Sequence, residues 1–390
     1  MAFDKTILQV IPAMDSGGAE RTTLEMVRAI IAAGGRAIVA TSGGRMVGAL
    51  EQAGAHVSIL PVQTKNPLTI VANASRLSGL IRETGADLIH ARSRAPAWSA
   101  LMAARRAGVP FVTTWHGAYR GGSPWKRFYN SAMARGDLVI ANSAFTAESI
   151  RASNDPGDRL MIIHRGADTE EFNLRLISDE RRAAILEKWG LGAGEGPVLL
   201  LPARLTDWKG HGVAIEAMGR LEKAGLAGVA KELRLIFAGD AQGRDGYAAS
   251  IARGVEDLGL GRMIRLVGHC DDMPAAYAAA DIVLSPSTRP EAFGRVAAEA
   301  GAMGRVVIAA DHGGARETVV DGETGFLAAP GSAEALANAV VRAIELGPQG
   351  RAAMGAKAAA RIAAKFSTAA MTAATIAAYK SLLDARTGQA

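Results

Sequence analysis

The chain has 390 residues, of which 49% are hydrophobic and 21% charged, so its composition excludes a disordered protein. At roughly 100–200 residues per domain, this length predicts two or three domains. A single cysteine, Cys270, excludes a disulfide scaffold and a cysteine-rich metal site. No apolar run reaches the roughly 18 residues of a membrane-spanning helix, and the first residues resemble a β-strand rather than a signal peptide. We therefore expect a cytoplasmic protein.

The net charge of +6 arises entirely in the first half of the chain. Residues 1–175 hold 20 Lys or Arg and 14 Asp or Glu, whereas the remainder holds 24 of each. Residues 88–136 contain no acidic residue, and they include Trp98, Trp115 and Trp125. A basic surface with amphipathic aromatic residues suits an anionic partner, although solvated basic helices are the simpler interpretation. The basic residues of this window are Arg92, Arg94, Arg105, Arg106, Arg120, Lys126, Arg127 and Arg135.

Short β-branched runs alternate with longer amphipathic stretches, such as Ala19–Ala33 and Asn66–Glu83, along the first half of the chain. Brief apolar runs of this kind are typical of strands buried on both faces. The repeated βα pattern predicts a parallel sheet flanked by helices. The expected strands are Thr6–Ile11, Ala37–Thr41, Val57–Leu60, Leu88–His90, Phe111–Thr114, Leu138–Ala141 and Met161–Ile163.

A second set of strands follows a polar, helical stretch at Thr169–Gly196. The sequence thus predicts an α/β fold with two Rossmann-like doubly wound domains, residues 1–170 and 171–369, facing across a cleft. The last helix, near residues 370–386, can pack back onto the first domain. Because open parallel sheets bind ligands at the carboxyl ends of their strands, we expect the site in that cleft. The second set of strands is Val198–Pro202, Leu233–Ala238, Met263–Val267, Ile282–Leu284 and Val306–Ala309.

A glycine pair, Gly17 and Gly18, follows the first expected strand in the sequence DSGGAE and precedes a helix. Glycines let a ligand approach the backbone, and a helix N-terminus favours anions. The stretch is neither a G-x-G-x-x-G motif nor a P-loop, which disfavours a dehydrogenase-like dinucleotide site. Such pairs are also common in turns without any function.

Two cations, Arg204 and Lys209, lie in the loop PARLTDWKG that follows the first strand of the second domain. Cations beside a helix N-terminus are suited to a diphosphate. Two ordinary surface cations are the alternative interpretation.

Two carboxylates, Glu291 and Glu299, lie in the stretch RPEAFGRVAAE after the strand Ile282–Leu284. Glu291 in the loop can hold sugar hydroxyls, and Glu299 on the helix can hold a ribose diol. Alanines flank Glu299 on a helix face that should be buried, so its carboxylate needs polar partners.

A histidine, His116, followed by Gly117, ends another strand in the sequence TTWHG. A lone histidine is usually structural, but this one should face the cleft.

These stretches, in this order, resemble the retaining glycosyltransferases of the GT-B architecture, and more narrowly family 4. The resemblance runs from GGAE through HG, ARLTDWKG and LIFAGD to VGHCDDMPAAYAAADIVLSPS and the pair Glu291 and Glu299. The N-terminal stretches QVIPAMDSGGAERTTLE and HARSRAPAWSALMAARRAGVPFVTTWHGAY are similar to lipopolysaccharide core mannosyltransferases of alphaproteobacteria. That similarity implies GDP-mannose as the donor and a phosphorylated or Kdo-bearing lipid A as the acceptor.

The resemblance also implies a role for each matching residue. Arg204 and Lys209 would neutralise the diphosphate leaving group, Glu291 would bind sugar hydroxyls, and His116 would contact the transferred sugar. Where relatives often have N-G-V-D, this chain has Arg165-Gly-Ala-Asp168, which leaves the role of Arg165 open. The implied donor-binding residues are Gly17, Gly18, Arg204, Lys209, His269, Glu291, Ala292, Phe293, Gly294, Val296 and Glu299. Arg92, Arg94, Arg120, Trp125, Lys126 and Arg127 are the candidates for contact with the acceptor or the inner membrane.

The expected enzyme needs no cofactor and no metal, because Asp271 and Asp272 lack a third ligand. Electrostatic stabilisation of the leaving diphosphate should be the largest catalytic contribution. A UDP-sugar donor and a sugar-nucleotide epimerase of the same architecture remain open alternatives, as does a non-enzymatic binding protein. No motif for nucleic-acid binding accompanies the charge.

Overall fold

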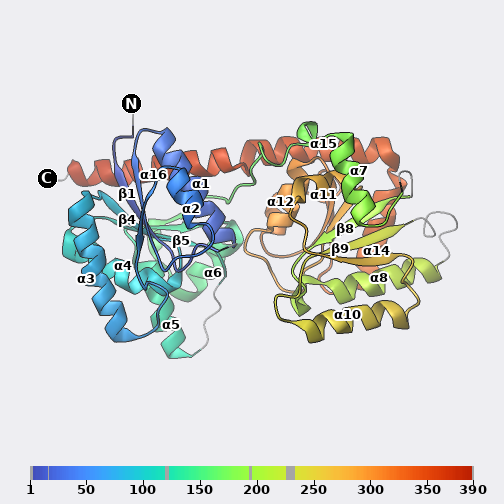
Figure 1. Cartoon of the computed structure of the whole chain (residues 1–390), viewed down its shortest axis with the longest axis horizontal. Helices are drawn as coiled ribbons and strands as arrows, with labels where there is room; N and C mark the ends of the chain where they lie inside the picture. The colour runs from blue at the N-terminus through green and yellow to red at the C-terminus, as the bar shows by residue number, and fades with distance from the viewer. Residues whose placement is uncertain (1–2, 16, 119–122, 193–195, 225–232, 389–390) are drawn as a thin grey trace. The chain divides into compact units, whose positions relative to one another are not determined.

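Figure 1 shows a computed structural model of the chain, which describes residues 3–15, 17–118, 123–192, 196–224 and 233–388. The chain divides into two compact units, Met1–Arg165 with Thr368–Ala390, and Gly166–Ser367. Each unit contains a parallel sheet with helices on both faces, so the predicted α/β fold with two doubly wound domains is confirmed.

The first unit is built on a seven-stranded sheet of order β3-β2-β1-β4-β5-β6-β7. The order reverses direction at β1 and β4, which pair in parallel from Ile7 with Leu88 to Val10 with Ala91. Ligands of such sheets bind where the strand order reverses. The strands are β1 (Thr6–Val10), β2 (Arg36–Thr41), β3 (His56–Ile59), β4 (Leu88–Ala91), β5 (Phe111–Trp115), β6 (Leu138–Ala141) and β7 (Leu160–Ile162).

Helices bury the two faces of this sheet in two apolar clusters. Helix α3 starts where the Asn66 carboxamide accepts from the amide of Leu68, at 2.9 Å, and ends at Gly85 with φ of 67°. A side-chain N-cap and a left-handed glycine are ordinary helix boundaries, so local sequence fixes this element. The helices are α1 (Gly18–Ala32), α2 (Val47–Gln52), α3 (Pro67–Thr84), α4 (Arg94–Ala107), α5 (Pro124–Ser131), α6 (Ala144–Asn154) and α16 (Thr368–Thr387).

The last helix, α16, belongs to the first unit although its residues follow the second. Met371, Ala378 and Leu383 lie in the same apolar cluster as Met26 and Val27 of α1. The Tyr379 side chain is fully buried, and its hydroxyl lies 2.5 Å from Nδ1 of His90. The helix therefore completes one face of the first sheet.

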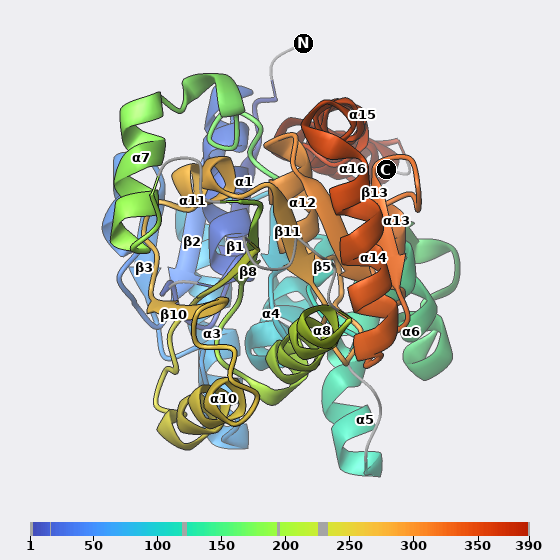
Figure 2. The same ribbon diagram turned by 90° about the vertical axis from the view of Figure 1, so that its right-hand side faces the viewer.

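The second unit holds a six-stranded parallel sheet of order β10-β9-β8-β11-β12-β13. Figure 2 shows α8, α10 and α14 on one side of this sheet and α7, α11 and α12 on the other, as the two apolar clusters require. The strands are β8 (Val198–Pro202), β9 (Arg234–Ala238), β10 (Ile264–Gly268), β11 (Ile282–Ser285), β12 (Val306–Ala310) and β13 (Gly325–Ala328). The helices are α7 (Asp179–Lys188), α8 (His211–Lys223), α10 (Asp245–Asp257), α11 (Met273–Ala279), α12 (Arg295–Ala302), α13 (Ala315–Thr318), α14 (Ala333–Glu345) and α15 (Gly347–Lys365).

One strand, β13, was not expected from the sequence. Its residues Gly325–Ala328 are few, start with glycine and include no β-branched side chain, so the usual strand signal is weak. Pairing with β12, from Val307 with Gly325 to Ala310 with Ala328, stabilises the strand. Among the described residues, no helix is both long and apolar enough to cross a membrane.

Candidate active site

Lys209 and Glu291 form an ion pair at the carboxyl ends of β8 and β11 in the second unit. Lys209 Nζ lies 2.8 Å from Oε1 of Glu291, and the two side chains are only 13% and 17% exposed. The Ser287 hydroxyl donates to the same Oε1 at 2.5 Å. The Lys209 ammonium also lies 4.4 Å from the centre of the Trp208 ring. The structure thus brings together two residues predicted separately, and it adds Ser287 and Trp208, which the sequence reasoning missed.

Gly210 holds the Lys209 loop against the end of β11. Its φ is 83°, and a Cβ atom at this position would come within 2.1 Å of the Pro286 carbonyl oxygen. A side chain would therefore be strained and would also clash with backbone. This close approach sets the reach of Lys209 toward the Glu291 loop.

Arg204 lies in the same loop but has a different environment. Arg204 is exposed, and its Nη1 lies 3.5 Å from Oε1 of Gln242, at the limit of a hydrogen bond. Gln242 has φ of 44°, the one positive value among the non-glycine residues that the structure describes. The structure therefore does not place Arg204 in the Lys209–Glu291 pair.

The backbone around Phe293 is supported by a second loop. Cβ atoms at Gly313 and Gly314 would each lie 2.5 Å from backbone atoms, the Glu291 oxygen and the Phe293 Cα. The amide of Gly314 donates to the Glu291 carbonyl at 2.9 Å. The Phe293 side chain is buried, so this loop can offer a ligand backbone groups and the Glu291 carboxylate, but not the Phe293 ring.

Glu299 is buried on α12, and the polar partners expected from its sequence position are present. Oε1 accepts from Arg295 Nε and Nη2 at 2.8 and 2.6 Å, and Oε2 accepts from the Tyr277 hydroxyl at 3.0 Å. Burial, reinforced by the Glu299 charge, raises the pKa of Tyr277 well above its usual value. A ribose diol would have to share this carboxylate with Arg295 and Tyr277. Arg295 lies four positions before Glu299 on the same helix, a spacing that allows the contact, whereas Tyr277 is 22 positions away and has no signal in the local sequence.

Three further residues, Gly294, Val296 and His269, were predicted to contact the donor. Gly294 has φ of 81° and caps α12, and Val296 packs partly against the apolar cluster on the α11 side of the sheet. His269 follows β10 with its side chain 64% exposed and with Nε2 3.0 Å from Oδ1 of Asp271. These positions leave the proposed nucleotide contacts of His269, Ala292, Gly294 and Val296 as predictions.

In the first unit, Gly17 and Gly18 form the start of α1. Gly17 is the N-cap residue, and no side chain caps the helix. A Cβ atom at Gly18 would lie 2.2 Å from Nη1 of Arg165, so the Arg165 guanidinium covers the Gly18 backbone. Arg165, whose role the sequence left open, is therefore a neighbour of the glycine pair.

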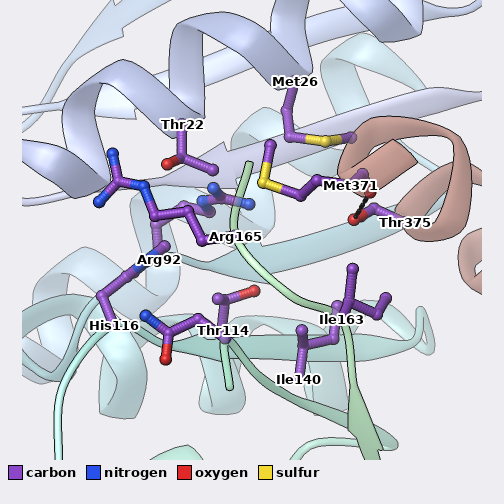
Figure 3. Close-up of a pocket in the computed structure, with 11 residues that line it drawn as sticks. Thr22, Met26, Arg92, Thr114, His116, Ile140, Ile163, Arg165, Met371 and Thr375 are labelled. Carbon is purple, nitrogen blue, oxygen red and sulfur yellow. Dashed lines mark hydrogen bonds between the residues drawn. The ribbon is translucent and has the colours of Figure 1, made fainter. Parts of the chain in front are cut away.

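His116 and Arg92 meet in one pocket at the ends of β4 and β5 (Figure 3). Burial, then the Arg92 and Arg165 charges, holds the pKa of His116 well below its usual value, so the imidazole is neutral. Arg92 is only 2% exposed. The expectation that Arg92 lies on a basic surface is therefore wrong, because the residue follows the buried strand β4 directly and turns inward.

Two of the remaining basic candidates, Lys126 and Arg127, lie on α5. Trp125 is 81% exposed and Phe128 is 56% exposed, and the exposed residues Lys126 and Arg127 lie between them along the helix. Phe128 stacks on Trp98 with ring centres 5.0 Å apart. Arg94 Nη1 donates to Oδ1 of Asn130 at 3.3 Å, which ties α4 to α5. Arg120 lies outside the described residues.

Among the described residues, no group of three or more His, Cys, Asp or Glu side chains is arranged to hold a metal ion. Arg181 donates two hydrogen bonds of 2.6 Å to the Asp272 carboxylate. Independence from metal stays a prediction.

The chain matches two family models. One, described as Glycosyltransferase Family 4, covers residues 16–171, and the other, described as Glycosyl transferases group 1, covers residues 186–361. A solved glycosyltransferase from Rickettsia africae is 32% identical, with a TM-score of 0.89 over 97% of this chain and 99% of that one. The structure of Anabaena Alr3699/HepE in complex with UDP is 25% identical, with a TM-score of 0.84 over 97% and 100%.

Two curated relatives are similar over shorter stretches. A D-inositol 3-phosphate glycosyltransferase of Xylanimonas cellulosilytica is 29% identical over 62% of this chain and 59% of its own length. A GDP-mannose-dependent alpha-(1-6)-phosphatidylinositol monomannoside mannosyltransferase of Mycolicibacterium smegmatis is 30% identical over 68% of this chain and 69% of its own length. The chain thus spans about three fifths of the first relative and about two thirds of the second.

Proposed function

Because this chain belongs to glycosyltransferase family 4 and has the GT-B fold, we propose that it is a retaining hexosyltransferase that moves mannose from GDP-mannose to a lipid-linked or lipopolysaccharide-core acceptor. Glycosyl transfer from a nucleotide sugar is the part that family membership supports. The observation that carries the chemistry is the Lys209–Glu291 pair at 2.8 Å at the carboxyl ends of two neighbouring strands.

Lys209 is suited to the leaving group of this reaction. An ammonium has three protons to donate, and the Glu291 contact uses one of them. The others can bind oxygens of the diphosphate, where negative charge grows as the glycosidic bond breaks. A cation held in place before the reaction stabilises that charge without reorganisation. Arg204, in the same loop, would supply a second and more exposed charge.

Glu291 is suited to the sugar. Its Oε1 accepts from Lys209 and Ser287, so Oε2 is the atom that faces hydroxyl donors in this role. One carboxylate would then position the sugar and orient the cation that binds its leaving group. Reaction would retain the anomeric configuration, by attack on the face that the diphosphate leaves, with a diphosphate oxygen accepting the proton of the acceptor hydroxyl.

GDP-mannose is the favoured donor because the Mycolicibacterium smegmatis relative is named for it at 30% identity. A UDP-sugar is the second candidate, since the Anabaena neighbour is solved with UDP and with UDP-glucose at 25% and 26% identity. An epimerase transfers no sugar to an acceptor, so an added acceptor would not increase its release of nucleoside diphosphate. This property separates an epimerase from a transferase that uses either donor.

The acceptor is proposed to be an anionic glycolipid at the inner face of the membrane, to which the chain would bind peripherally. Trp125 and Phe128 are large and exposed, and each is adjacent to a cation, Lys126 or Arg127, as suits an interfacial helix. Two further exposed apolar residues, Leu68 and Val71, start α3, which packs on α4 beside Trp98 through the Ser99–Ile70 hydrogen bond of 3.0 Å. These residues extend the interfacial surface beyond α5.

The test is a transfer assay with each donor in turn. Purified chain is mixed with GDP-mannose, UDP-glucose or UDP-galactose, with and without lipopolysaccharide-core acceptor, and nucleoside diphosphate release is followed. We expect release that requires acceptor and is fastest with GDP-mannose. The anomeric configuration of the product, read by nuclear magnetic resonance, tests retention. Release with no acceptor requirement, or a 2-epimer of the donor as the product, would refute the transferase proposal.

A further inference from the structure

A small pocket lies inside the first unit, under the first turns of α1. Figure 3 shows side chains from α1, α16 and the ends of the strands around it. Its volume is about 20 Å³, on a scale where one water molecule takes about 10–15 Å³. The pocket therefore admits one or two oxygen atoms. The polar residues that line it are Thr22, Arg92, Thr114, His116, Asn142 and Arg165.

Two guanidinium groups meet in this pocket. Arg92 is 2% exposed and Arg165 is 8% exposed. The groups that act on the Arg92 charge are the Tyr379 hydroxyl, through a hydrogen bond, and the Glu25 carboxylate. Burial lowers the pKa of Arg92, because an environment of low dielectric constant disfavours the charged form. Two guanidinium groups therefore share one small pocket, and Glu25 is an acidic residue that acts on the charge of Arg92.

Several polar atoms of the pocket lack partners. Among the described residues, neither Nε nor Nη2 of Arg92 has a hydrogen-bond partner, and neither do the two ring nitrogens of His116. A buried polar group without a partner costs roughly 1–3 kcal/mol. A purely structural Arg92 would account for the Tyr379 contact, but it would not account for these four nitrogens.

We propose that the pocket of Arg92, His116 and Arg165 is a subsite for an oxyanion, a phosphate or carboxylate carried by the acceptor. This inference rests on the proposed function. The anionic group would enter by one edge, with its oxygens accepting from Nε and Nη2 of Arg92. An arginine fork matches the geometry of phosphate and carboxylate oxygens. Arg165, held against Gly18, supplies the second charge.

His116 adds a constraint on the acceptor. A neutral imidazole has one donor and one acceptor nitrogen. It can donate to the bound oxyanion and accept from a hydroxyl beside it. The acceptor predicted by this pocket therefore carries an ionised group close to a hydroxyl on the same sugar or polyol, and uncharged sugars should be poor acceptors.

The test reads the His116 ring directly. The full chain, labelled with nitrogen-15 in histidine, is titrated with inorganic phosphate, with acetate, and separately with GDP and UDP. We expect phosphate or acetate to shift the His116 ring resonances, and Arg92→Met to weaken that response about tenfold or more. Lys209→Ala should keep the response to phosphate while it weakens binding of the nucleotides.

Tyr379→Phe is the matched control, because it removes the hydroxyl that bonds Arg92 and keeps the guanidinium. The His116 resonances of Tyr379→Phe should respond to phosphate as those of the wild type do. If Arg92→Met does not fold, Arg165→Gln serves as the second variant and should weaken the response. Equal loss in Tyr379→Phe and Arg92→Met would assign Arg92 a structural role and overturn the proposal. Absence of any His116 shift with phosphate and acetate would do so as well.

The source of the oxyanion is decided by the nucleotide arm. A shift of His116 by GDP or UDP that Arg92→Met abolishes would assign the pocket to the donor and overturn the acceptor assignment. The proposed function fails separately, through an absence of acceptor-dependent turnover in a chain whose His116 still responds to phosphate. Unchanged KM for an anionic acceptor in Arg92→Met would refute the subsite while leaving the transferase intact.

Discussion

The ammonium of Lys209 lies 2.8 Å from the carboxylate of Glu291, although 82 positions separate the two residues along the chain. The pair joins the loop after β8 to the loop after β11, so a single contact links the proposed binding of the leaving group to the proposed binding of the sugar. The pair is also mostly shielded from water, which preserves its electrostatic effect.

We expect Lys209→Ala to lower kcat by about 10²–10³, the usual effect of losing one charge-stabilising contact in a transition state. The fold should persist, and the far-ultraviolet circular dichroism should match the wild type. Lys223→Ala, at the exposed end of α8, is the control and should keep full turnover. Near-wild-type turnover in Lys209→Ala would end the diphosphate assignment.

Glu291→Gln should weaken donor binding more than it lowers stability. The amide keeps the size of the side chain and an oxygen for Ser287, but it removes the charge that pairs with Lys209. An imperfectly matched hydrogen-bond partner costs roughly 1–3 kcal/mol. Calorimetric titration with GDP-mannose measures the first effect and a thermal melt measures the second. A lower melting temperature with unchanged donor affinity would make Glu291 structural.

Addition of EDTA should leave turnover intact. The two cations Arg204 and Lys209 can balance the charge of the diphosphate, and no metal-holding cluster is present among the residues that the structure describes. The measurement is the initial rate before and after chelation and gel filtration. A rate that vanishes and returns with Mg²⁺ or Mn²⁺ contradicts the prediction.

Changing Arg120, Lys126 and Arg127 to Glu should sharply reduce binding to anionic vesicles, because each cation near such a surface contributes about 1 kcal/mol. Added salt should have the same effect on the wild type, through screening. The change of Lys223 and Arg253 to Glu, two exposed positions of the second unit, is the matched control. Donor affinity should hold in both variants. Normal binding of vesicles by the triple variant would show that this face is only solvated.

His211 should make the protein less stable in mild acid. Burial lowers its pKa from 6.5 to about 4, so the folded state keeps it neutral while the unfolded chain takes up a proton. The stability that the neutral His211 contributes is fully present above the pKa of the unfolded chain, about 6.5. It is lost as the pH falls from about 6.5 toward about 4, by about 1.4 kcal/mol per pH unit. Between about pH 7 and about pH 5, we expect the free energy of unfolding to fall by about 2 kcal/mol less in His211→Gln than in the wild type. His56→Gln, at an exposed position, should follow the wild type; a His211→Gln curve parallel to the wild-type curve contradicts the assignment.

Much of the fold was accessible from the sequence because buried parallel strands are short and β-branched, as in Val306–Ala310. The strand β13 was not, since its pairing with β12 rather than its own residues stabilises it. Likewise, chain positions indicated Lys209 and Glu291 but not their contact, which depends on the approach of Gly210 to Pro286. The expectation that Arg92 lies on the surface is wrong because the charge along a sequence does not show which way a side chain turns after a strand.

Helix α16 gives the two units different histories during synthesis. The second unit is one uninterrupted segment, Gly166–Ser367, and it can complete its core as soon as that segment has left the ribosome. The first unit is translated earlier but lacks Tyr379 and its apolar neighbours until α16 emerges. Its nascent form must therefore wait with one sheet face only partly covered, by α1 and α2, and this exposed apolar surface makes it the part of the newborn chain that most needs a chaperone.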